Sequence, residues 1–171
     1  MIPRKLVEIE QLCSIITDLR TAGWRIVFTN GCFDVIHPGH ILHLQQARQE
    51  GDVLVVALNS DKSIRRLKGS NRPIFNQQER GMVLNALESV DYIIIFDTLR
   101  VTNIIEAIQP AIYVKGGGYT AETLVSEEYE ALERCGAQII ILPEIGGFST
   151  TGVIERIHNV LGGGVNGFDC D

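Results

Sequence analysis

Apolar residues recur every three or four positions near the start of the chain. Leu6, Ile9, Leu12, Ile16 and Leu19 follow this spacing, and Gly23 comes shortly after them. The spacing is typical of an amphipathic helix, and glycine commonly follows a helix end. The pattern predicts a helix over residues 5–22 that packs against a sheet.

Further along, short apolar runs alternate with helical patterns. The runs predict strands at 25–29, 53–58, 92–96, 111–114 and 138–142, and the helical patterns cover 38–50, 76–88, 102–109, 126–135 and 150–161. Continuous Val and Ile content favours parallel strands buried on both faces. The alternation predicts an α/β fold, a single Rossmann-like, doubly wound parallel five-stranded sheet with flanking helices. We expect one domain over residues 1–161 and a flexible tail over 162–171, which contains four glycines.

Composition narrows the functional classes. The 171 residues are 45% hydrophobic and carry a net charge of −6 without a block of basic residues, which argues against a nucleic-acid partner. Four scattered cysteines form no CxxC pair, so neither a zinc ribbon nor a disulfide framework is predicted. No segment has the uninterrupted apolar core of a signal peptide or the length of a membrane span. We therefore expect a cytoplasmic protein with no membrane partner.

The segment after the first predicted strand carries the strongest chemical information. Pro38 suits the first position of a helix, so the helix is expected to start at His37 or Pro38. His37 and His40 are three residues apart and can converge on one anion, next to the free amides and positive dipole end of the helix start. Gly31 and Gly39 let the main chain approach a ligand. The segment predicts a phosphate-binding turn with two polarising imidazoles.

Other interpretations of these residues compete. A histidine pair could bind a metal, but no third ligand stands at a recognisable spacing, so no metal site is predicted. His43 and His158 are interpreted as solvated or structural, and Cys32 as a packing residue. Asp34 either ties down the loop or acts chemically. GxGxxG does not follow the first strand and GxxxxGK[ST] is absent, which disfavours a dinucleotide oxidoreductase or a P-loop kinase.

Residues 31–40 resemble the HxGH motif region of the cytidylyltransferase-like nucleotidyltransferases. Later segments are similar to the D-glycero-β-D-manno-heptose 1-phosphate adenylyltransferases, which form one domain of the bifunctional heptose enzymes of lipopolysaccharide precursor synthesis. These segments are Asn59–Asp61, Arg66–Gly69, Arg72–Ile74, Val114–Gly117 and Phe148–Thr151. The likeness runs from about Trp24 to Leu161.

Two details bear on the substrate. Glycerol-phosphate cytidylyltransferases of the superfamily usually carry a basic residue in an RTxGIST stretch, and residues 144–151 contain no arginine, which favours the heptose type. The heptose enzymes usually read KGGDY, whereas this chain has Gly118 in place of the aspartate. Loss of that carboxylate removes an acceptor for sugar hydroxyls, so the sequence does not define which sugar is bound. A CTP-dependent transferase acting on an alcohol phosphate such as glycerol-3-phosphate, or a non-catalytic nucleotide-binding module, stay as alternatives.

The resemblance implies transfer of AMP from ATP to a sugar 1-phosphate by in-line attack on the α-phosphate, with Mg²⁺ bridging the triphosphate. The catalytic candidates are His37, His40, Lys68 and Lys115. The nucleotide-binding candidates are Thr29, Asn30, Gly31, Cys32, Phe33, Asn59, Asp61, Arg72, Arg80, Gly116, Gly117, Ser149, Thr150 and Thr151. Lys68 and Arg72 are expected in a loop, Arg80 either in a surface ion pair or at the nucleotide, and Ser149 as a helix cap that still leaves amides for phosphate. The resemblance also suggests a homodimer.

Overall fold

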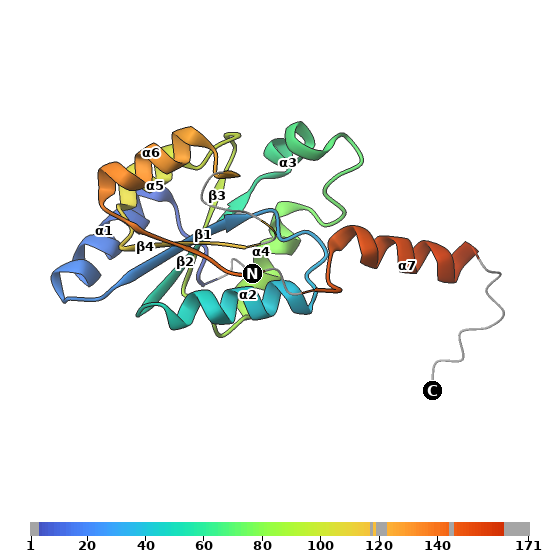
Figure 1. Ribbon diagram of the computed structural model, residues 1–171, viewed down its shortest axis with the longest axis horizontal. Helices are drawn as coiled ribbons and strands as arrows, with labels where there is room; N and C mark the ends of the chain where they lie inside the picture. The colour runs from blue at the N-terminus through green and yellow to red at the C-terminus, as the bar shows by residue number, and fades with distance from the viewer. Residues whose placement is uncertain (1–3, 117, 119–122, 144–145, 163–171) are drawn as a thin grey trace.

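A parallel five-stranded sheet forms the centre of the protein. The computed structural model describes residues 4–116, 118, 123–143 and 146–162. The strands are β1 (Ile26–Gly31), β2 (Val53–Asn59), β3 (Tyr92–Phe96), β4 (Ile112–Lys115) and β5 (Gln138–Ile141), in the order β3-β2-β1-β4-β5 (Figure 1). Each neighbouring pair is parallel. The predicted doubly wound fold is confirmed.

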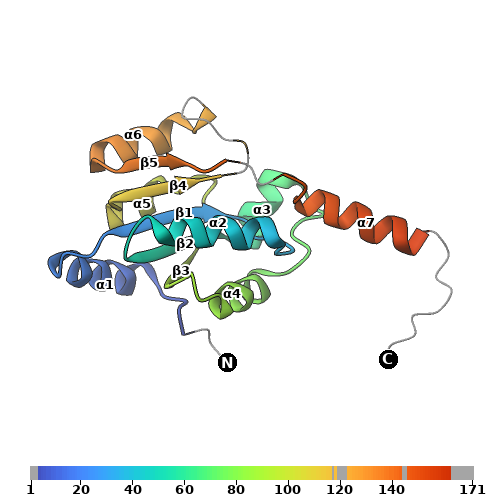
Figure 2. The ribbon, with the colours of Figure 1, turned by 60° about the horizontal axis from the view of Figure 1, so that its bottom comes forward.

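Helices cover both faces of this sheet. α1 (Ile9–Thr21), α5 (Thr102–Ile108) and α6 (Ser126–Cys135) lie on one face, while α2 (Pro38–Gln49) and α4 (Gln77–Ala86) lie on the other (Figures 1 and 2). α3 (Asp61–Lys68) and α7 (Thr150–Gly162) lie towards the carboxyl ends of the strands. None of the described helices is long and apolar enough to cross a membrane.

The alternation of side chains along β2 explains why both faces are covered. All seven residues of β2 are buried. Val53, Val55 and Ala57 pack into the core beneath α1, α5 and α6. Leu54, Val56 and Leu58 pack into the core beneath α2 and α4. Because successive residues of a strand point to opposite faces, one continuous apolar run supplies both cores.

The first helix begins later than its periodicity predicts. Leu6 forms a parallel bridge with Ile93, the Val7 amide donates to the Ile93 carbonyl at 3.0 Å, and the Ile93 amide donates to the Lys5 carbonyl at 2.8 Å. Residues 5–7 therefore lie along the edge of β3, and α1 begins at Ile9. Edge pairing by these backbone groups overrides the helical spacing of the apolar side chains.

A second difference is α3, a helix where the sequence predicts only a strand end and a loop. The Ser60 side chain accepts a hydrogen bond from the Ser63 amide at 3.1 Å and so caps this helix. Lys68 is the last residue of α3 rather than a loop residue. The predicted tail from residue 163 onward lies outside the described residues, and the domain bounds 1–161 stay a prediction.

Candidate active site

A cleft of about 620 Å³ lies at the carboxyl ends of the strands. From β1 the chain continues to β2 and β3 on one side of β1. It then crosses to β4 and β5 on the other side, so the strand order reverses between β1 and β4. Open parallel sheets bind ligands at such a switch point. Predicted residues that line the cleft are Thr29, Asn30, Gly31, Cys32, Phe33, His37, His40, Asn59, Lys68, Lys115, Gly116, Ser149, Thr150 and Thr151.

The histidine turn forms the start of α2 as predicted. His37 is the N-cap, Pro38 is the first helical residue, and the imidazoles of His37 and His40 stack with ring centroids 3.8 Å apart. The His37 amide donates to Nδ1 of His40 at 3.4 Å. A ring nitrogen that accepts a hydrogen bond carries no proton, so the neutral His40 ring holds its proton on Nε2. His40 therefore offers one donor to a ligand in the cleft.

Burial keeps both imidazoles neutral in the free protein. Desolvation, with smaller contributions from His37, His43 and Lys68, lowers the pKa of His40 to about 4. Burial also lowers the pKa of His37. At neutral pH the two rings are hydrogen-bond donors without charge. The positive charge at this cleft therefore comes from its lysines and arginine rather than from the histidine pair.

Two aromatic rings flank the histidine pair. The Phe33 ring centroid lies 5.4 Å from that of His40, and the Phe148 ring stacks on His37 at 6.5 Å with an interplanar angle of 14°. A Cβ atom at Gly39 would lie 3.0 Å from the Phe148 Cβ and 3.1 Å from the His37 ring. A side chain at position 39 would therefore force Phe148 or the His37 ring to move by a few tenths of an ångström, so glycine suits this close approach.

Asp34 anchors the loop between β1 and α2. Its buried carboxylate accepts hydrogen bonds from the amides of Ile74 and Phe75 and pairs with Arg72 at 3.1 Å. Phe33 and Val35, on either side of it, have φ angles of 45° and 50°. Left-handed backbone at such residues is strained and persists only where the surroundings hold it. The anchoring interpretation of Asp34 is confirmed, and Arg72 pairs with Asp34 and does not line the cleft.

Arg80 lies behind the cleft rather than on the surface or on the cleft wall. Its side chain is 1% exposed and pairs with Asp61 at 2.8 Å, and neither residue lines the cleft. Arg80 donates to the carbonyls of Cys32 at 2.6 Å and Asn59 at 2.8 Å. It therefore fixes the ends of β1 and β2 relative to one another. Of the two interpretations of Arg80, the ion pair with an acidic neighbour is found, but it lies inside the protein rather than on the surface because this side of α4 is buried. Contact of Arg80 with the nucleotide stays a prediction.

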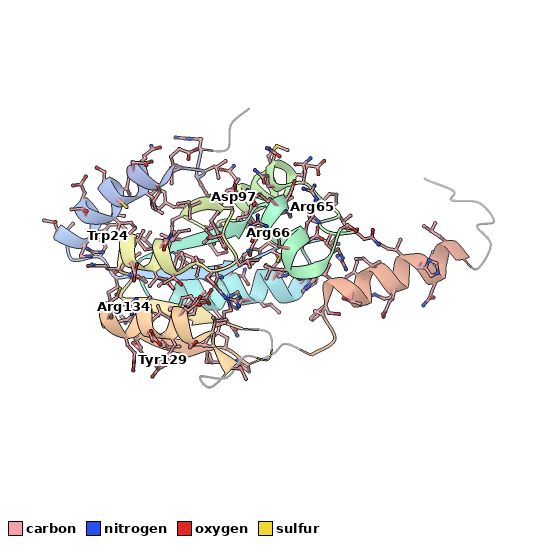
Figure 3. The ribbon with its side chains drawn as sticks, turned by 90° about the horizontal axis from the view of Figure 1, so that it is seen from above. Trp24, Arg65, Arg66, Asp97, Tyr129 and Arg134 are labelled. Atoms are coloured by element: carbon pink, nitrogen blue, oxygen red, sulfur yellow. The ribbon has the colours of Figure 1, made fainter. Side chains whose placement is uncertain are left out.

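Two lysine side chains, one on β4 and one on α3, line the cleft. Lys115 Nζ donates to Asn30 Oδ1 at 2.9 Å, and the Tyr113 hydroxyl donates to the same oxygen at 2.7 Å. Burial lowers the pKa of Lys115. Lys68 lines the cleft from the last turn of α3, whose Arg65 and Arg66 are exposed (Figure 3). This placement suits an anionic ligand at the open end of the sheet.

The start of α7 is tied to the histidine turn. Ser149 Oγ accepts from the Gly152 amide at 3.0 Å, which confirms the predicted cap. The Thr150 hydroxyl donates to the Asp34 carbonyl at 2.9 Å. A second helix N-terminus thereby lies beside the first, and helix N-termini favour phosphate. Gly117 lies outside the described residues.

Four polar residues line the cleft without having been predicted there: His43, Gln46, Arg100 and Glu128. His43 Nε2 lies 3.2 Å from Thr29 Oγ1, and burial lowers the His43 pKa to about 4. The structural interpretation of His43 is thus correct about its bonding but misses its place at the cleft. The spacing of three residues that links His37 to His40 continues to His43 and Gln46, and could have indicated them. His158 is exposed, as expected.

The open parallel sheet, the histidine turn and the basic cleft together define a nucleotidyltransferase. The chain belongs to the cytidylyltransferase-like family, whose model matches residues 28–156. The predicted resemblance to the HxGH enzymes is therefore confirmed.

Among the proteins with similar sequences are several bifunctional proteins HldE. The bifunctional protein HldE of Geobacter sulfurreducens is 45% identical over 158 residues, which are 92% of this chain and 32% of that protein. The bifunctional protein HldE of Hyphomonas neptunium is 52% identical over 137 residues, which are 80% of this chain and 28% of that protein. The chain thus spans about a third of the length of these relatives.

Solved structures share the fold. A lipopolysaccharide core biosynthesis protein from Thermoplasma volcanium has a TM-score of 0.58 and 27% identity, covering 72% of this chain and 98% of its own. A pantoate-beta-alanine ligase from Francisella tularensis has a TM-score of 0.56 over 91% of this chain and 78% of its own. At 16% identity the ligase supports the fold alone.

Proposed function

We propose that this chain transfers AMP from ATP to a sugar 1-phosphate of the heptose type and releases pyrophosphate. The observation that carries the proposal is the stacked pair of His37 and His40 at the start of α2, facing a cleft that Lys68 and Lys115 also line. The similarity to HldE proteins over most of the chain supports the heptose class of acceptor. The similarity to the Thermoplasma volcanium lipopolysaccharide core biosynthesis protein also supports an acceptor of this class.

The proposed reaction is a single in-line displacement. An oxygen of the sugar 1-phosphate attacks the α-phosphorus of ATP, the bond from that phosphorus to the bridging oxygen of pyrophosphate breaks, and the electron pair leaves with pyrophosphate. His40 donates from Nε2 to a phosphate oxygen, and Lys68 and Lys115 neutralise charge on the phosphates. Such reactions depend mainly on positioning and on electrostatic stabilisation. The amides at the starts of α2 and α7 hold the triphosphate.

Mg²⁺ accompanies ATP in this proposal. The described residues contain no group of three or more His, Cys, Asp or Glu side chains placed to hold a metal ion. Asp34 is occupied by two amides and Arg72. This donor set fits an ion held by substrate phosphates and water, a mode common for Mg²⁺. When bound, the ion would neutralise charge on the triphosphate.

The test is a matrix of nucleotides and acceptors. The chain is incubated with Mg²⁺, either ATP or CTP, and a panel of sugar 1-phosphates and glycerol-3-phosphate. Pyrophosphate is measured and the product is identified by mass. We expect pyrophosphate and a nucleoside diphosphate sugar with ATP and a heptose 1-phosphate. Product only with CTP and glycerol-3-phosphate would favour the cytidylyltransferase instead, and nucleotide binding without pyrophosphate would favour a non-catalytic module.

Two further proposals follow from the predictions about the whole protein. We propose a cytoplasmic location, since ATP and sugar phosphates are cytoplasmic metabolites.

We also propose a homodimer. α7 extends away from the sheet (Figure 1), and its apolar Ile157, Val160 and Leu161, which are more than half exposed, could pack against a second copy. Size-exclusion chromatography with light scattering tests the dimer, and a monomeric mass would contradict it.

A further inference from the structure

Glu128 is a buried carboxylate in the wall of the cleft. It belongs to the first turn of α6, is 5% exposed, and lines the cleft. Among the described residues, no lysine, arginine or histidine forms an ion pair with it within 4.0 Å. Burying a carboxylate is costly unless hydrogen bonds or a cation compensate for the lost water. The hydrogen bonds of Glu128 therefore decide what this side chain can do.

The two oxygens of Glu128 have different surroundings. Oε1 accepts a hydrogen bond from the Val101 amide at 3.3 Å and so joins α6 to the start of α5. Oε2 receives no hydrogen bond from the described residues, yet it is not among the side-chain polar atoms that are closed off from solvent. Because Glu128 lines the cleft, Oε2 is open to the cleft. An ionised carboxylate oxygen only accepts, so its ligand partner is an N–H or O–H donor.

Glu128 acts on Lys115, the cation at the end of β4. Burial lowers the pKa of Lys115, and the negative charge of Glu128 is the largest influence that opposes this shift. Lys115 donates to Asn30 Oδ1 at 2.9 Å, which fixes its Nζ atom at the end of β1. The cleft wall thus holds a cation and an acceptor oxygen near each other. A molecule that carries hydroxyl groups beside a phosphate matches both.

α6 and α2 lie on opposite faces of the sheet (Figure 2). Ala131 and Leu132 of α6 pack into one core, and Leu44 and Ala47 of α2 pack into the other. In the proposed reaction the starts of α2 and α7 hold the triphosphate. In-line displacement brings the attacking oxygen from the side opposite to the leaving pyrophosphate. Glu128 is therefore on the side of the acceptor.

We infer that Glu128 is a specificity-determining residue for the acceptor, with Oε2 accepting a hydrogen bond from a sugar hydroxyl while Lys115 holds the phosphate of the same molecule. The inference rests on the proposed function, because it takes the acceptor to be a sugar phosphate. Glu128 gains and loses no proton in this role and only binds and orients the sugar. A phosphate without hydroxyl groups lacks this contact.

Binding of two acceptors tests the inference without turnover. Heptose 1-phosphate carries hydroxyls, whereas methyl phosphate carries a phosphate alone. Each is titrated by calorimetry into the full chain loaded with Mg²⁺ and a non-hydrolysable ATP analogue. Glu128→Gln keeps an oxygen for the Val101 amide but turns an amide N–H towards the cleft. It should weaken heptose 1-phosphate binding about 10- to 150-fold, the range for one hydrogen bond to a charged group. Methyl phosphate binding should not weaken, because a negative charge beside Lys115 is lost.

Two further variants separate the contact from charge and from folding. Glu130→Gln is the matched control, since Glu130 lies on the same helix but is exposed and does not line the cleft. It should keep the wild-type affinities. Glu128→Asp keeps the negative charge but draws the carboxylate back by one methylene, so it should also lose the preference for heptose 1-phosphate. This variant keeps the test open if Glu128→Gln unfolds.

The ribose of ATP also carries hydroxyls, so ATP is compared with 2′-deoxy-ATP and 3′-deoxy-ATP. Glu128→Gln should leave the binding of all three nucleotides unchanged. Weaker binding of ATP alone would assign Glu128 to the ribose and overturn the inference.

An unchanged affinity for heptose 1-phosphate in Glu128→Gln would also overturn the inference, as would equal losses for heptose 1-phosphate and methyl phosphate. Each of these results leaves the proposed transfer reaction standing, provided that ATP and heptose 1-phosphate yield pyrophosphate. Conversely, Glu128-dependent binding of heptose 1-phosphate without pyrophosphate formation supports the inference and rejects the proposed catalysis.

Discussion

At the residue scale, the histidine turn depends on a few short contacts. The His37 amide fixes the orientation of His40 through Nδ1, and stacked rings with low pKa values leave neutral donors in the cleft. Neutral donors release no proton when they bind phosphate. In the proposed reaction His40 acts through its Nε2 hydrogen, whereas its Nδ1 atom holds the start of α2 through the His37 amide. These two functions of one ring can be separated by substitution.

His40→Asn separates them. The asparagine oxygen can replace Nδ1 as acceptor for the His37 amide, but nothing replaces the Nε2 donor. We expect turnover to fall by about 10²- to 10³-fold, the usual cost of one donor to a developing anion, with little change in stability. Pyrophosphate release and thermal unfolding measure the two effects. Turnover within a few-fold of wild type would contradict the role of Nε2.

Gly116→Ala tests the close approach of β4 to α2. The new Cβ would lie 2.7 Å from Nδ1 of His43, closer than carbon and nitrogen atoms pack, so the His43 ring must move from Thr29. We expect a loss of about 1 to 3 kcal/mol in the free energy of unfolding, the usual cost of overpacking. Gly146→Ala is the control, because no atom lies within 4 Å of its added Cβ. Equal stabilities in urea would contradict the predicted clash.

At the element scale, the loop after β1 is held from three directions. Asp34 binds the segment before α4, Arg80 of α4 binds the carbonyls that end β1 and β2, and Thr150 of α7 binds the Asp34 carbonyl. Strained backbone at Phe33 and Val35 persists inside this frame. α4 therefore acts as the support of the histidine turn although it contributes no cleft-lining residue.

Arg80→Met tests this support. It removes the hydrogen bonds to two strand ends and leaves Asp61 without its cation. We expect a loss of about 3 kcal/mol in stability, as for breaking a buried pair, together with weaker ATP binding. Arg134→Met is the matched control. Its pair with Glu106 is 2.6 Å long but half-exposed on α6 (Figure 3), so the loss should stay below about 1 kcal/mol. Similar losses in urea titrations of both variants would reject the support role.

At the scale of the whole molecule, the sequence predicts the sheet better than the cleft wall. Buried parallel strands appear as continuous apolar runs, and β3 falls at the predicted residues. α3 is missed because its strong determinant is the Ser60 cap rather than an apolar stripe. The motif residues His37 and His40 are local and hence visible in sequence. Glu128 and Arg100 reach the cleft only through packing of α6 against α5, which no local pattern shows.

The free energy of unfolding should depend on pH through the partly buried His40 and His43. His40 and His43 have pKa values of about 4 in the folded protein against an ordinary 6.5, so the unfolded chain binds more protons between these values. The free energy of unfolding should fall as the pH decreases from about 6.5 to about 4. We expect about 1 to 2 kcal/mol per histidine, less than the full shift because both rings are only partly buried.

His43→Gln provides the comparison, since the amide can keep the bond to Thr29 without titrating. Urea unfolding at several pH values should show a shallower decrease for this variant than for wild type. Parallel curves for the two proteins would contradict the low pKa of His43.

The central claim is that the paired imidazoles of α2 hold the reacting phosphates of ATP. A crystal structure of the protein with Mg²⁺ and a non-hydrolysable ATP analogue tests it most directly. We predict Nε2 of His40 within about 3.2 Å of a phosphate oxygen, with the triphosphate between the starts of α2 and α7. A triphosphate bound elsewhere, with both histidine rings in contact with solvent alone, would contradict the claim.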